Sequence, residues 1–299
     1  MSATPRQARR LLKAQPGLVL GSAMILVVVL FSVLYPLSGS YDAYGQNLGA
    51  TFVKPFSDPG FLFGTDSLGR DVASRLALAG RVTLSLVLIV VLANAVIGLI
   101  IGTVSGYFGG WLDNVLMGMA DVQLALPVTL VIIALSAVNG PSTMLMVTIL
   151  ALTFWVGYAR VSRSVSLGIS SRDFVLAPQL LGARNSWVIV KHIVPHVLTP
   201  VLILATADLG GVILLMSSFD FLGLGVQAPT PSWGIMINDG QRYLRQAPYL
   251  AILPGLAIFL FVAGTLLVSQ QFTSESRGRR RRKPSTTAKE YSPSAGVTR

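Results

Sequence analysis

One run of residues does most to limit what this chain can fold into. Residues 82–112 contain no Asp, Glu, Lys or Arg and are mostly apolar. About 20 such residues allow a helix to cross the hydrocarbon core of a bilayer. Across the chain 53% of residues are hydrophobic and 12% are charged, whereas soluble domains carry roughly 25% charged residues. The composition indicates an all-α integral membrane protein. It excludes a soluble enzyme, a disordered scaffold and, with no cysteine present, a disulfide-rich secreted domain.

Six apolar runs predict six transmembrane helices. They cover residues 17–36, 82–112, 111–138, 143–158, 197–221 and 249–272. The first run is longer than the roughly 7–15-residue core of a secretory signal and is followed by further spans, so we expect an uncleaved helix. The polar residues 37–81 form a loop with a short surface helix at 68–78. Gly98, Gly102 and Gly106 form a small-residue stripe on the second span, which predicts close packing against a neighbouring helix.

The positive charges are distributed unevenly. Of the 23 lysines and arginines, four precede the first run, five lie between Arg160 and Lys191, and eight lie from Arg277 onward. Six spans place these three clusters on one side of the membrane, and the positive-inside rule makes that side the cytoplasm. The expected organisation is a cytoplasmic N-terminal segment (1–16), a first transmembrane helix (17–36), an extracytoplasmic loop (37–81), a core of five helices (82–272) and a disordered basic cytoplasmic tail (273–299). The arginine run of the tail is expected to meet lipid headgroups rather than nucleic acid.

Motifs for common chemistries are missing or out of context. No lysine follows a glycine, so the chain has no P-loop for ATP. Gly223-x-Gly225-x-x-Ala228 fits a dinucleotide fingerprint but follows a membrane span rather than a β-strand. His192 and His196 share a helix face, yet no nearby carboxylate completes a zinc site. With no GxSxG elbow and neither histidine inside a span, we expect no catalytic residue and no metal site.

Three aspartates interrupt or border the predicted spans. A carboxylate at the bilayer centre costs about 2.5–3.5 kcal/mol on insertion scales, so such a residue is functional or paired by default. Asp121 and Asp220 stand near span ends, where we expect them to be solvated at the interface. Asp208 lies well inside its span and is the candidate for lining a polar cavity. As a mid-membrane carboxylate, it keeps open the alternative of a stand-alone secondary transporter or channel.

The most informative segment, DFVLAPQLLGARNSWVIVKHIVPH, begins at Asp173 and lies between the fourth and fifth spans. Asp173 is expected to cap a helix over 175–181, and Gly182 to permit a turn. A second amphipathic stretch is expected over 187–193, until Pro195. Two short helices separated by a glycine form a surface that a soluble partner can grip. The alternative is an ordinary connecting loop.

This segment resembles the cytoplasmic signature of permease subunits of bacterial ABC importers for peptides and nickel, specifically the C-type subunit of dipeptide and oligopeptide permeases. The family's signature reads Glu-Ala-Ala, three residues, Gly, nine residues, then Ile-x-Leu-Pro. Ala177, Gly182 and Pro195 match its first alanine, its glycine and its proline. Leu176 and Pro178 stand where Glu and the second Ala are usual. The sequence therefore departs from the family at the acidic residue and predicts a bent or shortened first helix.

Further motifs carry the resemblance over about residues 15–272. They are FGTDSLGRDVASR at 63–75, GRVTLSL at 80–86, YFGGWLD at 107–113, ALP at 125–127 and FLGLGVQAPTPSWGIMINDG at 221–240. The C-terminus departs from the family, which often continues Gly-Asp-x-Leu-Arg-Asp-x-x-Asp-Pro, whereas residues 269–282 read SQQFTSESRGRRRR.

The resemblance implies an ABC importer type I permease fold and a subunit of an ATP-driven importer of dipeptides or oligopeptides in the bacterial cytoplasmic membrane. Nickel or another peptide-like cargo is the alternative. The implied partners are a second homologous permease, ABC ATPase subunits or domains that bind ATP and Mg, an extracytoplasmic solute-binding protein and membrane lipid, with no cofactor on this chain. Within the segment 167–195, coupling to the ATPase is implied for Asp173, Phe174, Ala177, Gly182, Ala183, His192 and Pro195. We expect Asp208, Phe221, Pro229, Pro231 and Trp233 on the translocation path or against the binding protein.

Overall fold

The computed structural model describes residues 16–37 and 41–281, with side chains up to Gln271. Within these residues the chain is almost entirely helical and has no β-strand. Five helices are long and apolar enough to cross a membrane, and a sixth crossing results if one bent pair counts as a single span. The expected all-α membrane architecture is confirmed.

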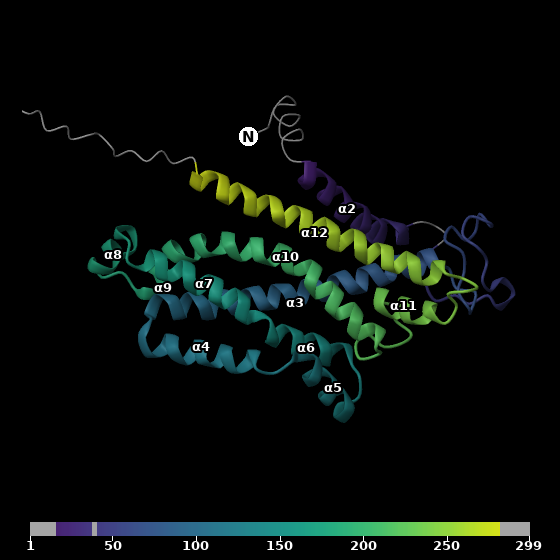
Figure 1. Ribbon diagram of the computed structural model, residues 1–299, viewed down its shortest axis with the longest axis horizontal. Helices are drawn as coiled ribbons and strands as arrows, with labels where there is room; N and C mark the ends of the chain where they lie inside the picture. The colour runs from purple at the N-terminus through teal and green to yellow at the C-terminus, as the bar shows by residue number, and fades with distance from the viewer. Residues whose placement is uncertain (1–15, 38–40, 282–299) are drawn as a thin grey trace, which may run out of the picture.

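The long helices run roughly along the length of the molecule (Figure 1). The helices are α2 (Pro16–Leu34), α3 (Val72–Phe108), α4 (Gly110–Leu124), α5 (Val128–Asn139), α6 (Thr143–Thr153), α7 (Trp155–Ser170), α8 (Asp173–Leu180), α9 (Asn185–Val188), α10 (Val194–Phe221), α11 (Trp233–Gln241) and α12 (Tyr249–Arg281). A π-helix, Ile189–Ile193, joins α9 to α10. Helices α8 and α9 lie at one end, and α11 lies with the loop 41–71 at the other (Figure 1).

Helix α3 begins earlier than expected. The separate surface helix at 68–78 is wrong, because one helix of 37 residues starts at Val72 and continues to Phe108. Asp71 caps it, since its carboxylate accepts hydrogen bonds from the backbone N–H groups of Ala73 and Ser74. No proline interrupts the first turns, and Arg81 donates to backbone carbonyls of α2 at 2.7–2.8 Å. The polar loop therefore ends at residue 71 rather than 81.

The predicted third span is two helices. Helices α4 and α5 are bent by 71° at a short break. Pro127 precedes α5 as its N-cap residue, and a proline removes a backbone donor and disfavours helical conformation at the residue before it. The run 111–138 therefore contains a bend that its apolar composition does not reveal.

Helix α12 extends beyond the predicted end of the sixth span. Its backbone is helical to Arg281, so the disordered tail expected from residue 273 is wrong for 273–281. The rest of that tail, 282–299, and the expected N-terminal segment up to residue 15 lie outside the described residues.

The glycine stripe of α3 packs on α7, as the sequence predicts. A Cβ added at Gly106 would lie 2.6 Å from the Arg163 carbonyl oxygen, and one at Gly102 would overlap the Ala159 carbonyl oxygen. One at Gly98 would overlap the Tyr158 side chain. Because only glycine leaves this space, the backbones of the two helices approach closely. This contact ties α3 to α7, the helix that leads into α8.

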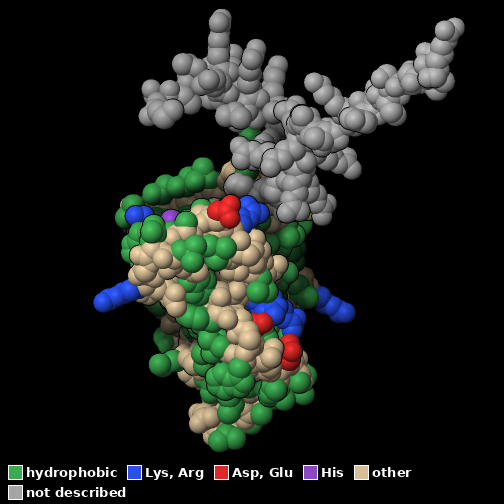
Figure 2. Space-filling view, turned by 90° about the vertical axis from the view of Figure 1, so that its left-hand side faces the viewer, with side chains coloured by type: hydrophobic (Ala, Val, Ile, Leu, Met, Phe, Trp, Pro, Cys, Tyr) green, Lys and Arg blue, Asp and Glu red, His purple; other side chains and the backbone are tan. Residues whose placement is uncertain are grey.

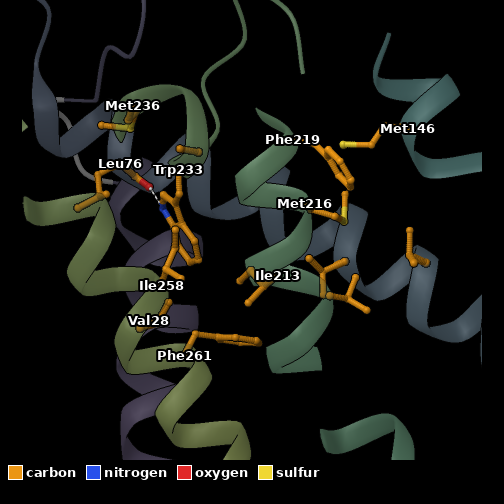
Figure 3. Packing of buried hydrophobic residues seen from close by; sticks show 14 of the residues in the cluster. Val28, Leu76, Met146, Ile213, Met216, Phe219, Trp233, Met236, Ile258 and Phe261 are labelled. Atoms are coloured by element: carbon orange, nitrogen blue, oxygen red, sulfur yellow. Dashed lines mark hydrogen bonds between the residues drawn. The ribbon is translucent and has the colours of Figure 1, made fainter. Parts of the chain in front are cut away.

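The largest core cluster surrounds Trp233 of α11 at the opposite end (Figure 3). Trp233 is 1% exposed, and its indole N–H donates to the Leu76 carbonyl oxygen of α3 at 3.2 Å. Its backbone N–H donates to the Thr83 hydroxyl at 3.3 Å. Side chains of α2, α10 and α12, among them Val28, Ile213 and Phe261, belong to the same cluster. The short α11 is therefore fastened to the membrane helices as part of one core.

Replacing Trp233 with phenylalanine is expected to lower the melting temperature of the purified chain by about 2–4 °C. The substitution keeps the aromatic packing but removes the indole donor, and one hydrogen bond contributes about 1 kcal/mol. Trp111 is 77% exposed, so Trp111→Phe serves as the control and should leave the melting temperature unchanged. Equal shifts for both variants would show that the Leu76 bond does not stabilise the fold.

Candidate functional site

The segment between α7 and α10 folds as two short helices around a glycine. Helix α8 starts at Asp173, but Arg172 is its N-cap residue and no side chain caps it, so the predicted capping role of Asp173 is wrong. Pro178 lies inside α8, which ends two residues later. Pro195 does not end the second helix either, because it stands in the first turn of α10. A first-turn N–H has no intrahelical partner, so a proline is tolerated there.

Gly182 forms the turn that the sequence predicts. Its φ is +83°, a backbone conformation that residues other than glycine rarely adopt. Its N–H donates to the Gln179 carbonyl at 3.0 Å, and the Ala183 N–H donates to the Pro178 carbonyl at 2.9 Å. A Cβ at Gly182 would meet nothing within 4 Å. Glycine is therefore needed here for its backbone conformation, and not to avoid a steric clash.

One side of this segment is anchored in the molecule. Val175, Val188 and Ile193 are fully buried and pack in a cluster with Val197 and Val201 of α10. The phenyl ring of Phe174 stacks on His196 at 5.5 Å between centroids, and the Trp187 ring meets the His192 ring edge-on at 5.2 Å. Both histidines thus lie against aromatic rings. No group of three or more His, Cys, Asp or Glu side chains that could hold a metal ion lies among the residues described.

The other side presents bare apolar surface. Leu180 and Leu181 are 87% and 88% exposed, and Phe174 and Leu176 are partly exposed beside them. Figure 2 looks onto this end and shows hydrophobic side chains over much of it, with charged side chains at only a few points. The two leucines therefore form an exposed apolar patch on an anchored segment. The sequence reasoning missed this pair, although two adjacent leucines before a glycine in a polar segment were a usable signal.

Tyr107, in the last turn of α3, links the segment to a membrane span. Its hydroxyl accepts from the Gln179 amide at 2.7 Å and donates to the Asn185 amide oxygen at 3.0 Å. Gln179 lies on α8 and Asn185 begins α9. One hydroxyl therefore connects both short helices to α3. These partners are 72 and 78 residues from Tyr107 in sequence, so spacing alone does not reveal them.

Replacing Tyr107 with phenylalanine is expected to make amide hydrogen exchange of residues 179–185 about five times faster. The variant removes both hydrogen bonds, each of which contributes about 0.5–1.5 kcal/mol. Exchange is measured by mass spectrometry on the purified chain. Tyr44→Phe, at the opposite end, is the control and should leave the segment unchanged. Equal exchange in the wild type and Tyr107→Phe would contradict the link.

An ion pair joins α4 to α7, the helix that precedes the segment. The Arg163 guanidinium of α7 binds both carboxylate oxygens of Asp113 of α4, at 2.5 and 2.6 Å. The Ser105 hydroxyl of α3 donates to the same carboxylate. This two-pronged geometry is the strongest form of an arginine–carboxylate pair. Asp121 pairs with Arg160 at 2.7 Å with both side chains exposed, which agrees with the solvated position expected for Asp121.

The remaining predicted residues lie apart from this segment. Asp208 is half-buried midway along α10 and close to Tyr158 of α7. Phe221 is half-buried at the end of α10, and Pro229 is exposed. Pro231 is buried together with Trp233. The Trp233 side chain belongs to the core described above, so in this conformation it faces neither open solvent nor a channel.

Asp220 differs from expectation. It is buried rather than solvated at an interface. Its carboxylate accepts the Val226 N–H at 2.8 Å, and a Cβ at Gly225 or Gly234 would press against the Asp220 side chain. This aspartate therefore holds the turn after α10 in place.

Known proteins are similar to this chain over most of its length. The family model described as "Binding-protein-dependent transport system inner membrane component" matches residues 96–274. The nickel transport system permease protein NikC of Escherichia coli K12 is 36% identical over 249 residues, which cover 82% of this chain and 89% of NikC. The dipeptide transport system permease protein DppC of Alkalihalophilus pseudofirmus is 31% identical over 259 residues, 87% of this chain and 84% of that protein. DppC of Haemophilus influenzae is 31% identical over 254 residues, 84% and 86% of the two chains.

Proposed function

Since the chain belongs to the family of binding-protein-dependent transport system inner membrane components, the permeases of ABC importers, we propose that it carries small peptides into the cell as one of two related permease subunits. ATP, with Mg, is bound and hydrolysed on separate ATPase partners. An extracytoplasmic binding protein delivers the cargo. The charge clusters support a cytoplasmic location for both termini, and we assign the α8 end to the cytoplasm as well.

One observation supports the proposed coupling most strongly. The segment 173–195 is anchored by a buried cluster and exposes Leu180 and Leu181 almost fully. An ATPase groove that covers the two leucines gains roughly 1.5–3 kcal/mol for each side chain buried. Phe174, Ala177 and Ala183 flank this tip on the same segment, and Gly182 provides its turn. We assign docking of the ATPase to this surface.

Movement of the docked segment reaches the membrane by two routes. Helix α10 continues from the segment to Phe221 as one helix of 28 residues. Tyr107 connects α8 and α9 to α3, which itself packs closely on α7. When nucleotide binding closes the ATPases, the difference in affinity between the open and closed states biases the permease between its conformations. The chain then acts as a mechanical and pore-forming part.

The assignment of residues to the translocation path is also a proposal. Asp208 is a polar group midway along a span, where a carboxylate is functional or paired, and we assign it to the wall of the path. Phe221, Pro229 and Pro231 belong to the segment after α10, which we place toward the binding protein. Trp233 joins this group only if α11 detaches from the core in another state of the cycle.

The cargo distinguishes two candidate functions. The two DppC relatives are named for dipeptides, and the NikC relative, at 36% identity, is named for nickel. The test is uptake of labelled dialanine and of radioactive nickel by cells that carry the chain or a deletion of it. Loss of dipeptide uptake alone supports the peptide proposal, and loss of nickel uptake alone assigns nickel. Unchanged uptake of both would contradict the proposed function.

A further inference from the structure

A cavity of about 230 Å³ lies at the end opposite the coupling segment. It opens between the end of the loop 41–71, the first turns of α3 and the stretch from α11 to α12. Its charged lining residues are Asp66, Arg70, Arg75, Asp239 and Arg242. Met236, Tyr243 and Leu250 supply an apolar wall. The mechanism above uses none of these side chains.

Arg75 forms the buried part of this lining. It is 4% exposed, and its Nη1 is buried without a hydrogen-bond partner among the residues that the structure describes. Its Nε lies 3.6 Å from the Asp66 carboxylate, which is too long for a hydrogen bond. A buried cation with an unpaired donor is costly. The cavity therefore contains a guanidinium whose Nη1 lacks an acceptor among the described residues.

The aspartates present do not supply that acceptor. Asp66 already accepts from the Arg70 Nε at 2.6 Å and from the backbone N–H groups of Leu68 and Arg70 at 2.9 and 3.0 Å. Asp239 is exposed at the mouth and forms no ion pair within the described part of the chain. Arg242, also exposed at the mouth, has no carboxylate partner among those residues either. Three arginines against two aspartates leave the lining with one excess positive charge.

We propose that this cavity binds a carboxylate group carried on a short aliphatic stem. A planar carboxylate matches the fork of a guanidinium, so its oxygens would pair with Arg75 inside and Arg242 at the mouth. The stem would lie along Met236 and Leu250. The chemistry follows from the cavity alone, whereas its position on the extracytoplasmic face rests on the proposed function. There, the carboxylate comes from the transported cargo or from an acidic side chain of the binding protein.

The first experiment uses the purified full-length chain and small probes. Its melting temperature is measured with increasing butyrate, butyramide and inorganic phosphate at constant ionic strength. We expect a saturable rise with butyrate, which carries a carboxylate on a short aliphatic stem, and none with butyramide, its neutral amide. Arg242→Gln should weaken the response at least fivefold, whereas Arg245→Gln, an exposed arginine outside the cavity lining, should leave it unchanged.

Arg75→Gln should abolish the response, and Arg242→Gln keeps the test valid if Arg75→Gln does not fold. Equal responses to the acid and the amide would overturn the proposal, as would a rise of the same size with phosphate. Equal responses of Arg242→Gln and Arg245→Gln would overturn it as well. This experiment needs no partner and no transport, so its failure leaves the proposed importer function standing.

A second experiment in the assembled importer identifies the source of the carboxylate. If the cargo supplies it, Arg242→Gln lowers uptake of a dipeptide with a free C-terminus several-fold more than uptake of its C-terminal amide. If the binding protein supplies it, Arg242→Gln lowers the affinity for that protein equally with either cargo. Unchanged uptake and unchanged affinity would contradict a carboxylate site that serves transport.

Discussion

Replacing Gly102 with alanine is expected to lower the melting temperature of the purified chain by about 5 °C or more, and replacing it with leucine to prevent folding. An added Cβ overlaps the Ala159 carbonyl oxygen and lies 2.7 Å from the Ser162 Cβ. Overpacking of a close contact costs typically 1–3 kcal/mol, and neither backbone can move without separating α3 from α7. The measurement is thermal unfolding in detergent, together with the monodispersity of each variant.

Gly157→Ala is the matched control. Gly157 lies on α7, the same partner helix, but an added Cβ meets nothing within 4 Å there. Alanine is more favourable than glycine in a helix interior by about 0.5–1 kcal/mol. The control should therefore leave the melting temperature unchanged or raise it, so the two alanine variants move in opposite directions. A Gly102→Ala chain as stable as Gly157→Ala would contradict the packing of these helices.

Replacing Gly182 with valine is expected to lower cargo-stimulated ATP hydrolysis of the assembled importer about tenfold. The φ of +83° costs a residue with a Cβ roughly 1–2 kcal/mol, and a β-branched residue is a marked outlier there. The turn would open and move Leu180 and Leu181 away from their docking position. A tenfold change corresponds to about 1.4 kcal/mol, which is within this cost.

Gly182→Asn separates conformation from volume in the same experiment. Asparagine adds more atoms than alanine but adopts the left-handed region more readily than other residues, and the position has open space around it. We expect Gly182→Asn to retain most of the coupling that Gly182→Val loses. ATP hydrolysis by the isolated ATPases provides the baseline. Equal losses for asparagine and valine would show that the surface of the turn, and not its backbone, is what coupling requires.

Local sequence signals predicted the features that depend on local physics. The apolar runs identify the spans because length and hydropathy alone determine which helices can cross a bilayer. The glycine stripe predicted a close helix contact, and Gly182 predicted a turn. In each case, the property that can be read from the sequence, such as the absence of a side chain in glycine, is the same property that determines the local structure.

The errors came from contacts between distant segments and from helix breaks inside apolar runs. Burial of Asp220 depends on the Val226 N–H and on the glycines packed against it, which no periodicity reveals. Pro127 bends a span that reads as one apolar run, although proline after a helical residue was an available signal. The sequence predicts that a helix ends at Pro195, yet the first turn of a helix accepts proline.

The proposed coupling surface contains both a feature that the sequence predicts and features that it does not. Its place in the chain follows from the signature at Ala177, Gly182 and Pro195. Its exposed tip and its link through Tyr107 depend on how α8 and α9 fold back onto α3, which needs the three-dimensional arrangement. The exposed leucines are therefore a result of the structure.

The most direct test of the account is to purify the tagged chain from its native membranes in mild detergent and to identify the proteins that accompany it by mass spectrometry. The account predicts a second six-span permease and a P-loop ATPase, with less ATPase recovered from a Gly182→Val preparation that keeps the second permease. Recovery of the folded chain alone, with cargo transport that does not require ATP, would contradict it. That result would indicate a secondary transporter or channel, with Asp208 as the next residue to replace.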